Sequence, residues 1–441
     1  MEEKTGQKSE TTPSVFDDQP VQVVETEEKV KYAIMTGFAI AILLSAGIFN
    51  TPGEIMQGMG RIVVAPSILV SDYMVIGNIG ASFFNAGILM LLSIIISHRS
   101  GVNMNGPVMA AAFTIAGFAL FGKNVVNIMP VILGVYLRSR YSNERFSRYL
   151  LPALFGTALG PLVSQVAFGY GFSPLPALAM AGVVGVTAGF MLPPLANHFI
   201  TFHEGFNLYN IGFTCGMVGM VFMGLFRALG LENQGTLIVA EGLNQTLAIY
   251  FGLLFGVMLL AGFFCNQKSF VQRYSGILKH SGRLVTDFVS LNGFGVALIN
   301  MALLGYGSMA YVLVVGGELN GPTIGGILTI VGFGAFGKHV KNVWPLFAGV
   351  YLASLFQIWE VTSTGALLAA LFGTTLAPIA GTFGWAFGII TGIVHMTMVM
   401  NVGFLHGGMN LYNNGFSGGF VAAVLATLFN SLNMFRGDSE S

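Results

Sequence analysis

The chain has 441 residues, of which 54% are hydrophobic and 9% charged, and its formal net charge is zero. About a quarter of the residues of an average soluble protein are charged, so this composition excludes an ordinary soluble domain. The zero net charge leaves no basic footprint for a nucleic acid. Two isolated cysteines, Cys215 and Cys265, supply neither a disulfide framework nor a metal cluster.

The first thirty residues differ from the rest of the chain. Residues 1–30 hold eight of the nineteen acidic residues, with Thr, Gln, Ser and Pro between them. Such a segment buries too little apolar surface to fold, so it predicts a disordered tail. We expect no cleavable signal peptide, because the first apolar run follows this acidic segment and is long enough to stay in a membrane.

The rest of the chain is a series of hydrophobic runs, many about 20 residues long, which is enough to cross about 30 Å of hydrocarbon. They predict an all-α polytopic membrane protein with about seven segments in each half of the chain. These segments are residues 32–50, 73–97, 104–122, 124–138, 148–169, 175–197 and 206–229, then 246–265, 288–316, 319–337, 339–355, 364–381, 383–402 and 408–432. The third and fourth of each half are short, Gly-rich or interrupted by Pro, which leaves open that they re-enter the membrane without crossing it.

The two halves are copies of one sequence. Residues 105–137 and 320–352 agree at 17 of 33 positions with an offset of 215. The offset is 217 at the Phe-Gly-Thr triplets that begin at Phe155 and Phe372. It falls to 203 at the Asn-Leu-Tyr-Asn motifs that begin at Asn207 and Asn410, so a connection in the second copy is shorter. The duplication predicts membrane repeats at residues 31–240 and 246–435, followed by a short tail at 436–441.

Basic residues predict how the copies are oriented. The loop after the fourth segment has no Lys or Arg in the second copy, whereas in the first it holds Arg138, Arg140, Arg145 and Arg148. The loop after the first segment has the opposite bias, with only Arg61 in the first copy but, in the second, Lys268, Arg273, Lys279 and Arg283. Cytoplasmic loops carry the excess of Lys and Arg. Equivalent loops are therefore expected on opposite sides, which predicts inverted-topology repeats with both termini cytoplasmic.

Asn105-Gly106-Pro107 and Asn320-Gly321-Pro322 open matching segments of the two copies. Asn is a good helix N-cap and Pro fits a first helical turn, so each triplet predicts a helix start within or beside the membrane. Solute sites of inverted-repeat transporters lie on such interrupted helices. We therefore expect Asn105 and Asn320 near mid-depth, close to each other and to Asn207 and Asn410. The alternative is an ordinary surface loop that opens a helix.

Other polar residues repeat within the apolar runs. Asn207, Tyr209 and Asn210 recur as Asn410, Tyr412 and Asn413. They either line a polar path or bond to a neighbouring helix as structural glue. Lys123 and Lys338 follow Phe-Gly in each copy. A charge at the bilayer centre costs about 3 kcal/mol or more, so each lysine either snorkels, as its place at a segment end favours, or faces a polar site.

His203 and His406 also match across the copies, but Glu204 corresponds to Gly407. That difference between the halves makes the two histidines and Glu204 candidates for a coupling-proton site.

The two-copy pattern is similar to that of inverted-repeat solute channels and transporters. The Asn-Gly-Pro pair loosely resembles the Asn-Pro half-helix caps of water channels, without the selectivity motifs of those families. The whole arrangement, with Asn-Gly-Pro, Phe-Gly-Lys and Asn-Leu-Tyr-Asn in each copy, also resembles a family of bacterial multi-spanning proteins known as a domain of unknown function. That last resemblance covers nearly the whole chain and implies no substrate.

We predict a protein that moves a small solute, in contact with membrane lipid and without a cofactor or catalytic residues. Lysines facing the site would favour an anion, and snorkelling lysines a neutral polar solute. The alternative is an intramembrane enzyme acting on a lipid or prenyl substrate, although no acid/base or metal constellation appears in the sequence. A sensor or scaffold is a third class, and the formation of a homo-oligomer is left open.

Overall fold

The computed structural model describes residues 25–265, 270–356 and 358–437. Within these ranges the chain is helical and forms no β-strand, which confirms the prediction of an all-α fold. Of the predicted tail at residues 1–30, residues 1–24 lie outside the described ranges. Residues 28–30 belong to the first helix. At the other end the last helix continues to Gly437.

The first copy contains ten α-helices. They are α1 (Glu28–Phe49), α2 (Pro52–Val64), α3 (Tyr73–Ile76), α4 (Ile79–Arg99), α5 (Gly106–Phe118), α6 (Val125–Tyr141), α7 (Leu150–Gly156), α8 (Gly160–Ser164), α9 (Pro174–Phe202) and α10 (Asn210–Ala228). The second copy follows the same order. Its described helices are α11 (Asn244–Cys265), α12 (Phe270–Ile277), α13 (Phe288–Asn292), α14 (Phe294–Val314), α15 (Gly321–Phe333), α16 (Val340–Phe356), α17 (Thr364–Gly373), α18 (Ala377–Phe383), α19 (Trp385–Val402) and α20 (Asn413–Gly437).

Ten helical segments of the described chain are long and apolar enough to cross a membrane, five in each copy. The protein is therefore a multi-pass membrane protein. The third of these segments in each copy, Phe146–Gly169 and Thr364–Phe383, is interrupted by a short 3-10 turn. The two remaining segments of each copy are the short ones that the sequence singled out. Because thirteen residues of helix span only about 20 Å, α5 and α15 are too short to cross about 30 Å of hydrocarbon.

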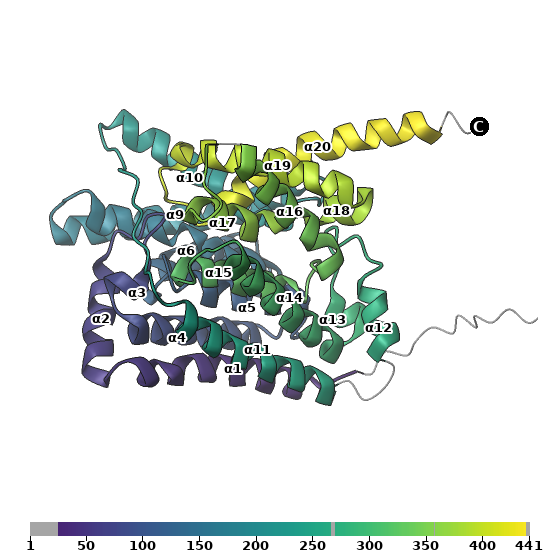
Figure 1. Ribbon diagram of the computed structural model, residues 1–441. Coiled ribbons are helices and arrows are strands. Elements are labelled where there is room, and N and C mark those ends of the chain that lie inside the picture. Colours follow the sequence, from purple (N-terminus) through teal and green to yellow (C-terminus); the bar gives the residue numbers. More distant parts are fainter. Residues whose placement is uncertain (1–24, 266–269, 357, 438–441) are drawn as a thin grey trace, which may run out of the picture.

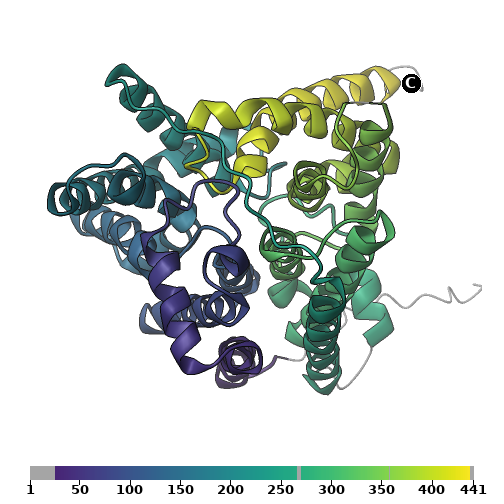
Figure 2. The same cartoon turned by 60° about the vertical axis from the view of Figure 1, so that its left-hand side comes forward.

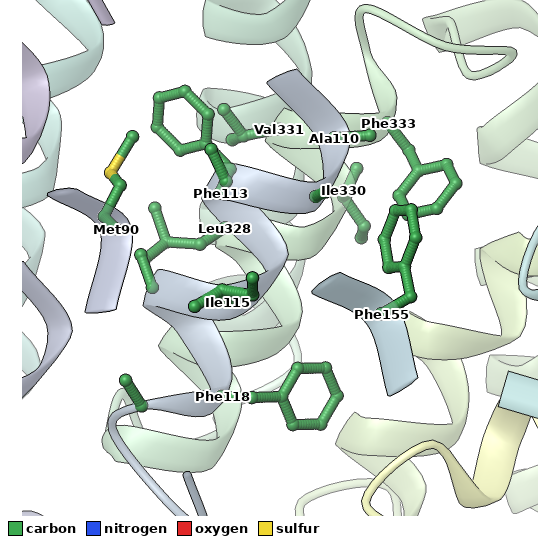
Figure 3. Close-up of a cluster of buried hydrophobic side chains, with 14 of the residues drawn as sticks. Met90, Ala110, Phe113, Ile115, Phe118, Phe155, Leu328, Ile330, Val331 and Phe333 are labelled. Carbon is green, nitrogen blue, oxygen red and sulfur yellow. The ribbon is translucent and has the colours of Figure 1, made fainter. Parts of the chain in front are cut away.

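α5 and α15 pack against each other at the centre of the molecule (Figure 1). All thirteen residues of each helix are buried, as expected for helices that are apolar on every side. Gly106, at the start of α5, lies against Ala335 just beyond α15, and Gly321 lies against Leu120 just beyond α5, so the helices run antiparallel. Figure 3 shows the interlocking side chains of this core.

Glycine permits the close approach of the two central helices. A Cβ atom added to Gly117 would lie 2.6 Å from the carbonyl oxygen of Gly325, and one added to Gly325 would lie 2.8 Å from that of Gly117. A side chain at either position would therefore push the helix backbones apart.

The longer helices surround this pair. α1 packs on α4 and α6 on α9, and the second copy repeats these contacts with α11 on α14 and α16 on α19. α10 and α20 join the copies. In Figure 1 the start of α1 and the end of α20 lie on the same side of the molecule, whereas α2 and α12 lie at opposite ends. Figure 2 shows the same arrangement with the α2 side turned forward.

Candidate functional site

The Asn-Leu-Tyr-Asn motifs form loops that reach into the opposite copy. The backbone N–H of Leu208 donates to the carbonyl oxygen of Thr375 (3.0 Å), and that of Leu411 donates to the carbonyl oxygen of Ala158 (3.1 Å). Thr375 and Ala158 lie in the 3-10 turns that interrupt the third crossing segment of each copy. Each loop is thus held at the point where the opposite copy's helix is broken.

These loops place two tyrosines beside two buried lysines. Lys123 Nζ donates to Tyr412 Oη (2.9 Å), and Lys338 Nζ donates to Tyr209 Oη (2.6 Å). Each bond joins the Phe-Gly-Lys motif of one copy to the Asn-Leu-Tyr-Asn motif of the other. We call this arrangement the crossed lysine–tyrosine pairs. Lys338 makes a second bond, to Thr374 Oγ1 (2.7 Å).

The expectation that the lysines snorkel is wrong, because both have 0% of their surface exposed. They follow α5 and α15, which are too short to reach the far side of the membrane, so a residue just after either helix lies in the interior. From the apolar runs alone, these segment ends are expected at the membrane interface.

Aromatic rings enclose the two ammonium groups. Lys123 Nζ lies 4.8 Å from the centroid of the Tyr412 ring, and Lys338 Nζ lies 4.5 Å from that of Tyr209. Phe118 contacts Tyr412 and Phe333 contacts Tyr209, with ring centroids 4.6 and 4.8 Å apart. The negative faces of such rings attract a cation.

Among the described residues, no carboxylate forms a salt bridge with either lysine. The salt bridges found in the described part of the chain are Lys31–Glu28, Arg148–Glu144 and Arg283–Glu204, all of them outside the buried centre. A buried ammonium without a counter-ion carries an effective penalty of several kcal/mol. An anion bound beside either lysine would therefore be stabilised.

The asparagines of the two loops bond mainly to the protein itself. Asn207 Nδ2 donates to the carbonyl oxygen of Gly415 (2.9 Å), and Asn207 Oδ1 accepts from Thr375 Oγ1 (2.6 Å). Asn410 Nδ2 lies 3.4 Å from the carbonyl oxygen of Gly212. Asn210 and Asn413 donate to the ends of α9 and α19, at Ala196 and Val399. These contacts correspond to the alternative in which the four amide side chains bond to neighbouring parts of the protein and do not line a polar path.

The coupling candidates differ in burial and in their bonding partners. His203 Nε2 bonds to Asn210 Oδ1 (3.0 Å) and His406 Nε2 to Asn413 Oδ1 (2.9 Å), and both rings are fully buried. Glu204 is instead exposed and pairs with Arg283, with the oxygen and nitrogen 3.4 Å apart. Its φ of 51° matches the φ of 56° at Gly407, so glycine in the second copy suits a left-handed turn that both copies share.

The Asn-Gly-Pro triplets open helices as predicted, with Asn105 Oδ1 accepting from the N–H of Val108 and Asn320 Oδ1 from that of Thr323, both at 3.1 Å. The structure does not bring the two triplets together, because they lie at opposite ends of the antiparallel pair. Each helix start faces an aspartate of the opposite copy instead. Asp287 Oδ1 accepts from the Gly106 N–H (2.9 Å), and Asp72 Oδ2 accepts from the Gly321 N–H (3.1 Å).

A cavity of about 260 Å³ leads from the surface to Tyr209 and Tyr412, the two tyrosines of the crossed lysine–tyrosine pairs. Its inner end is lined by Tyr209 and Tyr412, together with matching residues of the two central helices, Thr114, Thr329, Phe118 and Phe333. At its outer end lie the exposed residues Arg148 and Asn197. We call it the first cavity. Most of its lining is apolar, and Arg148 is its one charged lining residue.

Thr114 is the most informative residue that the sequence analysis missed. Its hydroxyl is buried, lines the first cavity and has no hydrogen-bond partner among the described residues. Thr329, its counterpart, donates to the carbonyl oxygen of Gly325 (2.8 Å). A usable signal was present, since Thr114 and Thr329 are one of the identical positions of the duplicated block.

The fold and these contacts define a polytopic all-α membrane protein built from two copies of one sequence, joined at the centre by matching polar bonds. Residues 51–228 and 266–431 match the model of one protein family, described as "Protein of unknown function (DUF1576)". The chain belongs to that family, which confirms the resemblance to a domain of unknown function. No curated protein and no solved structure gave a match to the chain.

Proposed function

We propose that the protein moves a small polar or weakly anionic solute across a bacterial plasma membrane and catalyses no reaction. The observation that carries the proposal is that Tyr209 and Tyr412, the tyrosines of the crossed lysine–tyrosine pairs, line the inner end of the first cavity. Inverted-repeat transporters bind their solutes near mid-membrane, where the two repeats meet. In this protein the lysines and tyrosines of both copies bond to each other where the copies meet.

The proposal includes inverted copies with both termini cytoplasmic. Three observations support it: the antiparallel packing of α5 and α15, the location of α2 and α12 at opposite ends of the molecule (Figure 1), and the opposite Arg and Lys bias of equivalent loops. Five crossing segments per copy is an odd number, so the second copy must begin on the side opposite to the first. The mouth beside Arg148 is then cytoplasmic.

The lining of the first cavity narrows the chemistry of the solute. Thr114 offers a hydroxyl that has no hydrogen-bond partner in the described part of the chain. Tyr209 accepts a hydrogen bond from Lys338, so its own phenolic proton can be donated to a solute. The remaining walls are largely aliphatic and aromatic. These features support a compact solute with an apolar body and one acceptor group, such as a carboxylate or an amide.

Binding to the purified protein tests this chemistry. Propionate, propionamide and propylamine share a three-carbon body and differ in charge. We expect propionate to raise the melting temperature most, propionamide less and propylamine least. The Tyr209→Phe/Tyr412→Phe protein keeps both rings and removes both hydroxyl groups, so it should lose the response. Protein-dependent uptake of the best binder into vesicles then tests transport. Equal responses to all three compounds, or an unchanged response in the double variant, would contradict the proposal.

A further inference from the structure

A second, smaller cavity of about 110 Å³ lies in the part of the protein related to the first by the internal duplication. We call it the second cavity. Its lining includes Val70, Gly365, Phe372, Met400 and Leu411. At the offsets of 215, 217 and 203 found in the sequence, every one of them has a counterpart that lines the first cavity. Val70 corresponds to Val285, for example, and Phe372 to Phe155.

The two cavities differ in depth. The first reaches both tyrosines of the crossed pairs and the unpartnered hydroxyl of Thr114. The second ends at Phe372 and Leu411 and is lined by neither tyrosine. The centre is therefore reached through the first cavity, while the second stops short of it.

The outer ends explain part of this difference. Arg148 and Asn197 are both exposed at the outer end of the first cavity. Their counterparts are Gly365 and Met400, and these are packed together, since a Cβ atom on Gly365 would lie 2.9 Å from Met400 Cε. The thioether of Met400 thus helps to close the second cavity.

From these observations we infer that the protein is an alternating-access carrier, in which the two cavities are the entrances from opposite sides to one central site. The inference rests on the proposed function. Two copies of one sequence can adopt each other's conformations, and exchanging them produces a second state with the opposite cavity open. The structure is the state open beside Arg148. In the other state the Gly365–Met400 contact opens and the first cavity closes.

Reciprocal accessibility tests the inference without knowledge of the solute. In a Cys215→Ala/Cys265→Ala background, Asn197→Cys reports on the first cavity and Met400→Cys on the second. A membrane-impermeant maleimide is applied separately to each side of the membrane. We expect Asn197→Cys to react rapidly from one side and Met400→Cys more slowly from the other.

A bulky substitution in one cavity, here called a wedge, should then shift the equilibrium between the two states. Gly365→Trp places bulk in the tight contact with Met400, so it should hold the second cavity open and slow the labelling of Asn197→Cys several-fold. Gly307→Trp is the matched control, because a Cβ atom there meets no atom within 4 Å. The reverse wedge, Ala196→Trp in the wall of the first cavity, should slow the labelling of Met400→Cys. It provides an independent test if the Gly365 variant does not fold.

If neither wedge changes labelling in the opposite cavity, the cavities are independent and the inference is overturned. Uptake of solute with such uncoupled labelling would indicate a channel and would leave the proposed function standing. Reciprocal labelling without uptake of any tested solute would support alternating access and count against the proposed solute class.

Discussion

The two halves of the buried centre are not equally bonded, and a matched pair of substitutions can measure the difference. Within residues 25–265, 270–356 and 358–437, Lys338 donates to both Tyr209 and Thr374, whereas Lys123 donates only to Tyr412. Thr157, the counterpart of Thr374, donates to the carbonyl oxygen of Leu154 and makes no bond to Lys123 within the described chain. The Lys338–Thr374 bond is therefore present in one copy only.

A double-mutant cycle isolates that bond. Lys338→Met keeps most of the side-chain volume, and Thr374→Val replaces the hydroxyl by a methyl group. Hydrogen bonds to charged groups contribute about 1.5–3 kcal/mol, so we expect a coupling free energy of that size between the two substitutions. The matched cycle of Lys123→Met and Thr157→Val should give a coupling close to zero.

The free energy of unfolding can be measured by denaturation in mixed detergent micelles, with the wild-type protein and the six variants of the two cycles under the same conditions. The single Lys→Met variants of the two cycles provide a further comparison. We expect Lys123→Met to be less destabilising than Lys338→Met, because it loses one hydrogen bond fewer. Equal couplings in the two cycles, or the reverse order of the single variants, would refute the bonding described here.

Three further predictions concern the packing of α5 and α15, the aspartates at the starts of these helices, and the exposed Glu204. Gly325→Leu should reduce the free energy of unfolding by about 1–3 kcal/mol or more, the range for overpacked cores, because its side chain would meet Phe121 and Gly117, whereas Gly307→Leu should change it little. Asp72→Ala should destabilise the protein more than Asp287→Ala in the same assay, because each carboxylate accepts from three backbone N–H groups but Asp72 is fully buried, whereas Asp287 is partly exposed. Glu204→Gln should change stability by less than about 1 kcal/mol and leave solute binding unaltered from pH 5 to 8, since Glu204 lies in an exposed ion pair.

Much of the fold could be predicted from sequence because it is recorded in local patterns. Long apolar runs mark the crossing helices, and Asn-Gly-Pro marks the start of α5 and α15 through its capping chemistry. The repetition of the motifs also pointed to Lys123, Lys338, Tyr209 and Tyr412 as a set.

The partners of these residues could not be predicted in the same way, because they lie in the opposite copy. Nothing near Lys123 in sequence indicates Tyr412, which is 289 positions away. The contact between Asp72 and the start of α15 depends in the same way on how the copies pack. Thr114 was missed because a hydroxyl in an apolar helix normally bonds to its own backbone, as Thr329 does.

The account depends most directly on two inverted copies that meet around one central path. Ser142 and Thr362 lie in equivalent loops, after α6 in the first copy and after α16 in the second. In the background without native cysteines, Ser142→Cys and Thr362→Cys can each be labelled with an impermeant maleimide from either side of the membrane. We predict that Ser142→Cys reacts only from the cytoplasmic side and Thr362→Cys only from the opposite side. Labelling of both from the same side would contradict the inverted arrangement and the central path built on it.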